Sequence, residues 1–314
     1  MQVNQATLAD LYKTFRVLYM EAYQGGPVVR PQFCTTIPAP TMEVFLKWLG
    51  AMPGMKKFLG ELQIRNLAAH GFPTYLEKFA DAVAVPEEDI ENDTYGVYNP
   101  MMSAMGLAAR QHPDELLANT MLGGFSAKCY TGKNFFDNNH EPVAGGQKFS
   151  NLHTYKLSVN SFRDARANIK NRKNAERRPM GLGIDLVLVV SPSNETLAKQ
   201  IVAADLIAEK VTNAGGSVVG GVAVSNMDAK SARAFAWSQL AGAPDAWFLL
   251  ECGFPIKPFS YLENKATTFS SLTSPTSDHV FKKHEYLYQA FGRYNTGYLL
   301  PELAEGSDGS TAAL

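Results

Sequence analysis

The sequence is poor in cysteine and in charged residues. Its three cysteines, Cys34, Cys129 and Cys252, lie far apart, and no two have Cys-x-x-Cys spacing. An odd number of scattered cysteines is a poor disulfide framework, so we expect free thiols and a reducing compartment. Charged residues make up 19% of the 314 residues, and the formal net charge is -1. Free nucleic-acid-binding proteins are normally basic, so composition argues against strong DNA binding by the whole chain.

Long apolar segments are also missing. No stretch reaches about 18 consecutive apolar residues, which excludes a transmembrane helix. The start, MQVNQATLADLYKTF, lacks the basic region and apolar run of a signal peptide. Hydrophobic residues nevertheless make up 46% of the chain, which is enough for a substantial core. We therefore expect a soluble protein made inside the cell, with no membrane partner.

Helical and extended patterns mix along the chain without regular alternation. Apolar residues at helical spacing predict a helix over residues 6–23 and the longest helix within 86–124, where Pro113 should kink or restart it. Buried strands are predicted at 185–193 and 246–253. No βαβ repetition and no internal repeat is visible, so the expected fold class is α+β.

A long hairpin is the most informative extended feature. Residues 57–70 and 75–85 flank a turn candidate at Gly71-Phe72-Pro73, which predicts two antiparallel strands. In the second segment, Phe79 shares one face with Asp81, and alanines occupy the other. An isolated two-stranded ribbon is marginally stable in water. We therefore expect it to lean on another surface, such as a second subunit.

Several other segments are expected to be irregular or weakly ordered. Residues 27–42 contain four prolines and are predicted to be extended without regular structure. Residues 266–275 are polar, β-prone and predicted to be flexible, and a late strand is predicted at 279–291. The tail GSDGSTAAL, residues 306–314, is expected to be disordered or draped over a neighbour.

The stretch CYTGKNFFDNNHEP, residues 129–142, is the strongest candidate for chemistry. Cys129 and His140 could act as nucleophile and base, with Asp137 orienting the imidazole. Cys129 follows an apolar run, however, and is better explained as a small buried residue between two turn sequences. A carboxylate and histidine metal site is disfavoured because no known ligand spacing is present. We therefore predict no catalytic, cofactor-binding or metal-binding residues, with the cysteine hydrolase as an alternative.

Clusters of opposite charge lie far apart in the sequence. The run from Arg163 to Arg178 holds seven Lys/Arg and forms part of a predicted basic helix over 159–173. It lacks aromatic residues for base stacking, so any nucleic-acid contact would be to phosphate. A solvated helix or a salt-bridging subunit contact is the preferred interpretation. The acidic run from Glu87 to Asp93 would be its complement if the two meet across an interface.

Four segments carry a resemblance to a known family. They are VAVPEEDIENDTYGVYNP (83–100), AARQHPDELLANTMLGGF (108–125), CYTGKNFFDNNHEP (129–142) and HEYLYQAFGRYNTGY (284–298). In this order they resemble the major head (capsid) subunit of Mu-like tailed bacteriophages. The resemblance implies the Hong Kong 97-type capsid fold, with a spine helix within 88–124.

The resemblance also implies a domain organisation. The expected parts are an N-terminal arm (1–35), an extended loop region (36–88), a peripheral domain (89–157 and 261–305), an axial domain (158–260) and a C-terminal tail (306–314).

The function implied by the resemblance is structural. Many copies would form the hexamers and pentamers of an icosahedral phage head around double-stranded DNA, with no enzymatic step and no cofactor. Implied partners are further copies of the chain, weakly bound DNA, a scaffold, a maturation protease, a portal and a possible decoration protein. The expected location is the virion, with assembly in the bacterial host cytoplasm. Alternatives are the Cys129/His140 hydrolase and a phosphate-binding protein using Arg163–Arg178.

Hydrophobic pattern and the domain analogy together suggest which residues form assembly interfaces. The candidates are Leu11, Phe15, Leu62, Ile64, Phe72, Phe79, Glu87, Glu88, Asp89, Arg163, Arg166 and Arg172.

Overall fold

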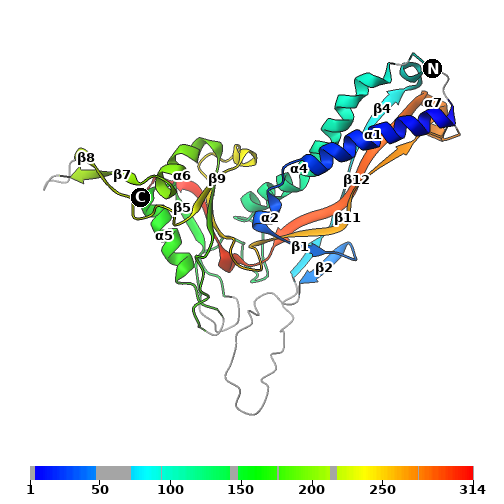
Figure 1. Ribbon diagram of the computed structural model, residues 1–314. Helices are drawn as coiled ribbons and strands as arrows, with labels where there is room; N and C mark the ends of the chain where they lie inside the picture. Colours follow the sequence, from blue (N-terminus) through cyan, green and yellow to red (C-terminus); the bar gives the residue numbers. More distant parts are fainter. Residues whose placement is uncertain are drawn as a thin grey trace, which may run out of the picture.

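The protein has two lobes that lie side by side in Figure 1. The computed structural model describes residues 4–46, 72–92, 94–141, 148–174, 177–212, 218–274 and 276–313. The long lobe is built on a four-stranded sheet of order β1-β11-β12-β4, and the broad lobe on a five-stranded sheet of order β5-β13-β10-β6-β9. Two further pairs, β2-β3 and β7-β8, form separate two-stranded ribbons. The mixture of helices and sheets agrees with the expected α+β class.

The helices and strands have the following bounds. The helices are α1 (Gln5–Gly25), α2 (Arg30–Phe33), α3 (Glu87–Glu91), α4 (Asn99–Gly123), α5 (Val159–Lys170), α6 (Glu195–Val202) and α7 (Asp278–Lys283). The strands are β1 (Cys34–Pro38), β2 (Glu43–Leu46), β3 (Phe72–Tyr75), β4 (Glu77–Pro86), β5 (Leu152–Tyr155), β6 (Leu186–Val190), β7 (Leu206–Thr212), β8 (Val218–Ser225), β9 (Arg233–Ala236), β10 (Trp247–Glu251), β11 (Phe259–Leu272), β12 (Glu285–Tyr298) and β13 (Ala304–Thr311).

Helix α1 confirms the predicted N-terminal helix and packs onto the long lobe. It begins at a capping box in which Asn4 accepts from the Thr7 amide at 2.9 Å. Its apolar stripe faces α4 and the sheet, because residues three or four apart lie on one side of a helix. Figure 1 shows α1 and α4 together along the sheet. The buried residues of the stripe are Leu8, Leu11, Phe15 and Tyr19.

Helix α4 is continuous from Asn99 to Gly123, and Pro113 lies inside it without ending it. The next residue, Asp114, is buried and accepts hydrogen bonds from the backbone amides of Val29 (2.7 Å) and Arg30 (3.1 Å). These amides begin the short helix α2, so the Asp114 carboxylate caps it from a distant part of the chain. The contact fixes the segment between α1 and β1 on the spine of the long lobe.

Gly106 allows α1 and α4 to approach closely. A Cβ atom at this position would stand 2.3 Å from the backbone oxygen of Tyr19 on α1. Changing Gly106 to alanine should therefore lower stability by about 1–3 kcal/mol, although alanine is the better helix former. Thermal unfolding of G106A beside G96A tests this, because a Cβ at Gly96 meets nothing within 4 Å. Equal stability of the two variants would contradict the close contact.

Strand β6 is an unbroken run of apolar residues because both of its faces are buried in the broad lobe. Alternate residues of this strand enter two different cores, because successive side chains point to opposite faces of a sheet. Leu188 packs with α5 and α6, whereas Val189 packs with the C-terminal half of α4 and with Phe136. Strand β10 is buried on both faces in the same way. The predicted strands at 185–193 and 246–253 are confirmed.

The predicted hairpin of residues 57–85 is wrong in its pairing. Phe72-Pro73 is not a turn, because residues 72–75 form β3, which pairs with β2. Residues 77–86 form β4 as an edge strand of the long lobe, paired with β12 along its whole length. Residues 57–70 lie outside the described residues. The alternation within β4 is confirmed, since Val85 is buried while the intervening alanines are exposed.

The structure corrects two predictions for the C-terminal third: the free tail, and the late strand, which is confirmed only from residue 285 onward. Residues 304–311 form β13, which lies between β5 and β10 in the sheet of the broad lobe, so 306–314 is not a detached tail. The late segment begins as helix α7 because Ser277 caps it, and strand β12 then extends from 285 to 298.

Residues 259–272 form the long strand β11, and residues 34–38 form β1. Tertiary pairing thus orders segments whose local sequences are polar or rich in proline.

Candidate assembly surfaces

Two predicted interface residues are core residues of this chain. Leu11 and Phe15 are 5% and 0% exposed, and they pack with the sheet of the long lobe. The rings of Phe15 and Tyr288 make an edge-to-face contact with centroids 5.0 Å apart. These residues therefore hold α1 on its own subunit, and a role for them between subunits stays a prediction.

The acidic segment lies at the far end of the long lobe and is partly engaged within the chain. Glu87 lies 3.2 Å from His284 Nδ1 and accepts a hydrogen bond from Tyr286 at 3.0 Å. Asp89 accepts from the Tyr98 hydroxyl at 2.5 Å. Glu88 is exposed. Of the three, Glu88 is the best placed to meet another subunit.

Two of the predicted arginines form ion pairs within the broad lobe. Arg163 and Arg166, on α5, contact the two oxygens of Asp228 at 2.6 Å and 2.9 Å. Asp228 itself is buried. The acidic segment on α3 belongs to the other lobe, so the two charged runs do not meet within one chain. Their pairing across subunits stays a prediction, and the arginines available for it are fewer than the sequence suggests.

Arg172 is buried, and its guanidinium is fully engaged within the chain. It donates to the backbone oxygens of Pro301 (3.2 Å), Glu302 (3.1 Å) and Ser150 (3.0 Å), and it forms an ion pair with Glu305. The guanidinium joins the end of α5 to the segments around Ser150 and Pro301. All of its described contacts lie within one chain, and a role for it between subunits stays a prediction.

The remaining predicted residues divide into two groups. Leu62 and Ile64 lie outside the described residues. Phe72 and Phe79 are half-buried, and Phe79 packs between β4 and α4 with its ring centroid 4.4 Å from that of His112. Neither phenylalanine is fully covered by the part of the chain that the structure describes.

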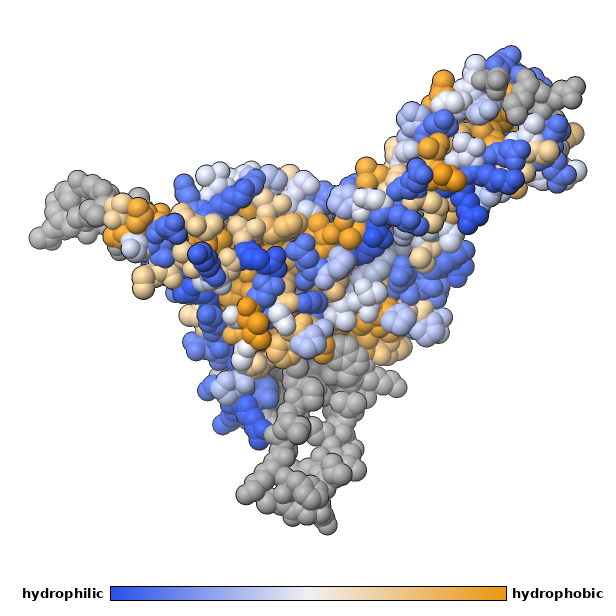
Figure 2. Space-filling view, viewed as in Figure 1, coloured by the Kyte–Doolittle hydropathy of each residue, from blue (hydrophilic) through white to orange (hydrophobic). Residues whose placement is uncertain are grey.

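Sequence reasoning missed most of the exposed apolar side chains. They interrupt the polar surface on both lobes, as the orange patches of Figure 2 show on one face. Hydrophobic pattern alone could not find them, because scattered apolar residues on a surface resemble core residues in a sequence. The most exposed are Val17, Phe45, Tyr75, Val97, Ile184, Leu206, Met227 and Phe281.

The polar stretch around Cys129 forms a chain of hydrogen bonds rather than a nucleophile and base in contact. The thiol of Cys129 lies 3.2 Å from the hydroxyl of Thr131, which lies 2.9 Å from His140 Nδ1. His140 Nε2 faces two acceptors, Phe135 O at 3.2 Å and Asn151 Oδ1 at 3.1 Å. The ring proton therefore sits on Nε2, and Nδ1 accepts from Thr131.

The electrostatics of this cluster oppose nucleophilic catalysis. Burial raises the pKa of the Cys129 thiol and lowers the pKa of His140 to about 4. A reactive cysteine needs the opposite arrangement, with a lowered thiol pKa beside a cationic imidazole. Cys129 and His140 are both buried. The cluster is structural, as the turn chemistry of its sequence indicated.

The buried His140 should make the fold sensitive to acid. Its pKa is about 4 in the folded protein and about 6.5 when unfolded, so the unfolded chain binds more protons between these values. Stability from this group is complete above pH 6.5 and falls by about 2–3 kcal/mol as the pH drops to 4.5. Urea unfolding at pH 7 and 4.5 measures this loss. The H140Q variant should lose less than the parent, and an equal loss would exclude His140 as the cause.

The described part of the chain offers neither a membrane-spanning helix nor a metal-binding cluster. None of its helices is both long and apolar enough to cross a membrane. No group of three or more histidine, cysteine or acidic side chains in these ranges is arranged to hold a metal ion.

Comparison with known families identifies the chain. The model of the Mu-like prophage major head subunit gpT matches residues 8–156 and 221–313, which is more than half of the sequence. The chain belongs to the Mu-like major head subunit family. This head subunit is therefore a capsid protein, and it is not an enzyme.

Individual relatives agree with the family. The head subunit is 25% identical over 308 residues to the major head subunit of the Mu-like prophage FluMu from Haemophilus influenzae, covering 97% of this chain and 75% of that protein. It is 30% identical over 140 residues to the major capsid protein of Escherichia phage Mu, covering 45% of this chain and 46% of that protein.

A solved capsid structure has the same fold. The procapsid of bacteriophage JBD30 matches with a TM-score of 0.59 and 26% identity, covering 97% of this chain and 76% of that chain. The fold of the head subunit is thus of the Hong Kong 97 type, as the sequence resemblance implied. As a capsid protein, the head subunit belongs to the virion.

Proposed function

We propose that the head subunit assembles with itself into hexamers and pentamers of a closed icosahedral shell around double-stranded DNA. The observation that carries the proposal, beside family membership, is that two of the four sheets in the described ranges are two-stranded ribbons with no third strand paired to them. Such ribbons are marginally stable alone. The β7-β8 ribbon projects from the broad lobe in Figure 1, where a neighbouring subunit can support it.

The two lobes support a domain assignment. The long lobe corresponds to the peripheral domain, and the broad lobe to the axial domain around the five-fold and six-fold centres. Strands β5 and β13 belong to the broad lobe, so the axial domain includes residues 152–155 and 304–311 in addition to much of 158–260. Residues 5–25 form a helix of the long lobe rather than a free arm.

Many modest contacts suffice to hold each subunit in the shell. A subunit bound at several places gains by multivalency, because each further contact forms at high effective concentration. The buried area per subunit should exceed the ~1,600 Å² of a standard pair interface. The formal net charge of -1 suits weak, non-specific contact with packaged DNA. A scaffold, a maturation protease, a portal and a possible decoration protein complete the proposed partners, with assembly in the host cytoplasm.

Negative-stain microscopy of the purified head subunit tests the proposal. Shells, tubes or capsomers are the expected result, and a chain that stays monomeric at every concentration would falsify it. The β2-β3 ribbon offers a directed variant, since the Tyr75 side chain is 60% exposed there. Tyr75→Asp should raise the concentration needed for assembly about tenfold, which corresponds to about 1.4 kcal/mol.

The control for this variant is another exposed apolar residue. Val17→Asp, at a side chain that is 55% exposed on helix α1, removes a similar apolar surface away from both two-stranded ribbons. Both variants should unfold at the parent temperature, because surface changes alter stability little. Assembly of Tyr75→Asp at the parent concentration would remove the β2-β3 ribbon from the interface.

A further inference from the structure

Positive charge gathers at the C-terminal end of α5 and in the hairpin that follows it. Lys170 is the last residue of the helix, and Lys173 and Arg177 lie in the hairpin, which an antiparallel bridge at Lys173 closes. All three are exposed, and none has an ion-pair partner among the described residues. In the described residues from 148 to 178, Asp164 provides the only exposed carboxylate. This end of the broad lobe is therefore locally basic, although the whole chain has a formal net charge of -1.

A fourth cation lies close to these three. Lys148 and Lys173 line the same hollow, which has a volume of about 290 Å³ and also carries two asparagine residues. Lys148 is 4.0 Å from Glu141, and its side chain is 60% exposed, so this ion pair is loose and contributes little. We refer to Lys148, Lys170, Lys173 and Arg177 as the basic patch. Figure 2 shows hydrophilic residues at the lower end of the broad lobe, below α5 in Figure 1.

Stability of the fold explains only part of this charge. A cation at a helix C-terminus interacts favourably with the helix dipole, which accounts for Lys170 but not for Lys173 and Arg177 beyond the helix. The stem of Lys170 lies against Gly183, because a Cβ atom there would stand 2.6 Å from the Lys170 Cε. Packing of the stem lowers the entropy lost when the ammonium group binds a ligand. The basic patch therefore presents more charge than the described carboxylates around it neutralise.

The hollow offers no free aromatic ring in the part of the chain that the structure describes. Its one aromatic residue, Phe149, stacks on His140 with ring centroids 4.9 Å apart, and the Arg172 guanidinium lies 4.3 Å from the same ring. Proteins that bind single-stranded nucleic acid stack its bases on exposed rings. Contacts of lysine and arginine with phosphates need no rings and carry no sequence information. The basic patch therefore suits the backbone of a duplex of any sequence.

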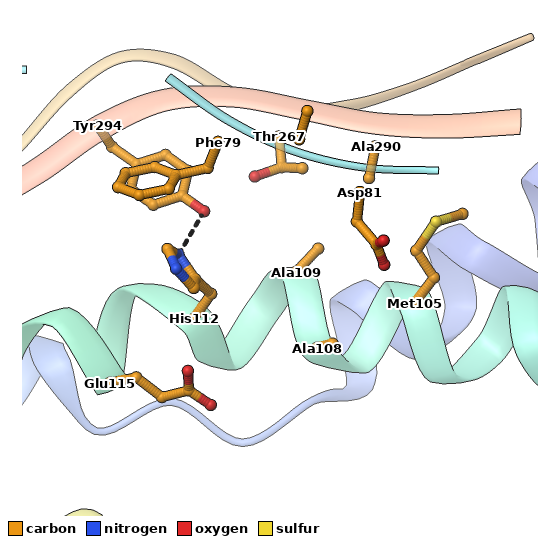
Figure 3. Close-up of a pocket in the computed structure, with 11 residues that line it drawn as sticks. Phe79, Asp81, Met105, Ala108, Ala109, His112, Glu115, Thr267, Ala290 and Tyr294 are labelled. Carbon is orange, nitrogen blue, oxygen red and sulfur yellow. Dashed lines mark hydrogen bonds between the residues drawn. The ribbon is translucent and has the colours of Figure 1, made fainter. Parts of the chain in front are cut away.

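The groove between β4 and α4 has the opposite character. Asp81 and Glu115 line it, and Figure 3 shows Asp81 on the side of the strands and Glu115 on the helix. His112 in this groove already contacts the Tyr294 hydroxyl at 3.1 Å. Carboxylates repel phosphate groups, so this part of the long lobe is unsuited to DNA. Charge directs a duplex to the broad lobe instead.

The acidic run of a second copy is a weaker partner for the basic patch. Glu87 and Asp89 already accept hydrogen bonds within their own chain, from Tyr286 and Tyr98. This engagement reduces the charge that the run offers to four cations. A DNA duplex presents one negative charge per about 1.7 Å of its axis, so it supplies a phosphate to each cation of a patch. Charge therefore favours DNA over a copy of the chain.

We propose that the basic patch binds the phosphate backbone of the packaged double-stranded DNA, so that this end of the broad lobe faces the interior of the shell. The inference rests on the proposed function and identifies the surface that meets one of its partners. With four cations, each subunit makes a weak contact that does not depend on sequence. Repetition of the patch over the shell makes the sum of these contacts significant.

Titration of dispersed subunits with a DNA duplex of about 30 base pairs tests the basic patch. The logarithm of the binding constant should fall with the logarithm of the salt concentration with a slope of about -3 to -4, because each neutralised phosphate contributes about -0.9. The triple variant Lys170→Gln, Lys173→Gln, Arg177→Gln should reduce this slope by about 2–3 and weaken binding about tenfold at low salt. Two duplexes of unrelated sequence should bind alike, and a clear preference for one would contradict contact through phosphates alone.

The matched control removes the same charge from the long lobe. Lys13, Lys282 and Lys283 are exposed there, and the triple change of these residues to glutamine should leave DNA binding as in the parent. Both triple variants should unfold at the parent temperature, because surface changes alter stability little. Equal losses in the two variants would show that binding follows net charge rather than the basic patch. That result, or unchanged binding by the patch variant, overturns the inference.

Microscopy of the same proteins separates this inference from the proposed function. If the parent chain forms no particles, self-assembly itself fails. If the parent and the patch variant both form particles but bind DNA equally, self-assembly stands and the DNA-binding surface is wrong. If the patch variant fails to form particles while the parent succeeds, the basic patch contacts a second copy of the chain, which also overturns the inference. The expected result is normal particles with weakened DNA binding.

Discussion

Replacing Arg172 with leucine is expected to lower the free energy of unfolding by about 3–5 kcal/mol, because it leaves a buried carboxylate without its cation. Glu305 is fully buried and also lies 3.0 Å from His153 and 3.3 Å from the amide nitrogen of Asn168. Loss of the guanidinium also leaves backbone oxygens at the junction of the lobes without donors. Urea unfolding measures the change.

Two comparisons make this prediction specific. Lys173→Leu removes a neighbouring exposed cation and should change stability by less than about 0.5 kcal/mol. Adding Glu305→Gln to the Arg172 variant should cost less than the sum of the two single changes, because they share one interaction. Additive losses, or a loss below about 1 kcal/mol for Arg172→Leu, would show that the ion pair contributes little.

Replacing Phe15 with aspartate should unfold the long lobe rather than block assembly of a folded subunit. Removing a buried phenylalanine costs about 3–5 kcal/mol, and burying a carboxylate in its place adds several more. Whole domains are stable by about 5–15 kcal/mol, so little stability would remain. The expected result is loss of near-ultraviolet circular dichroism and of solubility.

The exposed neighbour on the same helix is the control. Val17 is 55% exposed, and Val17→Asp should fold as the parent does. A soluble, folded Phe15→Asp subunit that fails only in assembly would instead support α1 as an arm that contacts other subunits. The burial of Phe15 against Tyr288 argues for the first outcome.

Local patterns were sufficient for elements that carry their own signal. The α1 stripe, the long helix within 86–124 and the strands β6 and β10 follow directly from apolar spacing, although Pro113 does not restart the helix. Patterns failed where pairing depends on distant residues. Strand β13 has a polar sequence, GSDGST, and is a strand because β5 and β10 lie on both sides of it. Phe72-Pro73 resembles a turn in sequence but belongs to β3, which pairs with β2. The local sequence does not reveal this pairing.

The candidate surfaces were harder to predict than the fold. The basic and acidic runs suggest complementary charges between subunits, yet Arg172 is buried and Arg163 is paired with Asp228 within one chain. Apolar residues such as Phe15 were assigned to interfaces and proved to be core. A sequence does not reveal which charged and polar groups form ion pairs or hydrogen bonds with each other inside the folded chain. The resemblance to a family predicted the function, whereas the exposed and buried residues could be told apart only in the folded structure.

The position of β13 has a consequence for how the subunit is made. A ribosome produces β5, β6, β9 and β10 before it produces β13, yet β13 lies between β5 and β10 in the finished sheet. Until residues 304–311 emerge, β5 has no partner there, and the broad lobe stays incomplete during translation. Nascent chains therefore cannot present a finished broad lobe to their neighbours. Chains truncated before residue 304 lack β13 in the same way, so they should be excluded from growing heads.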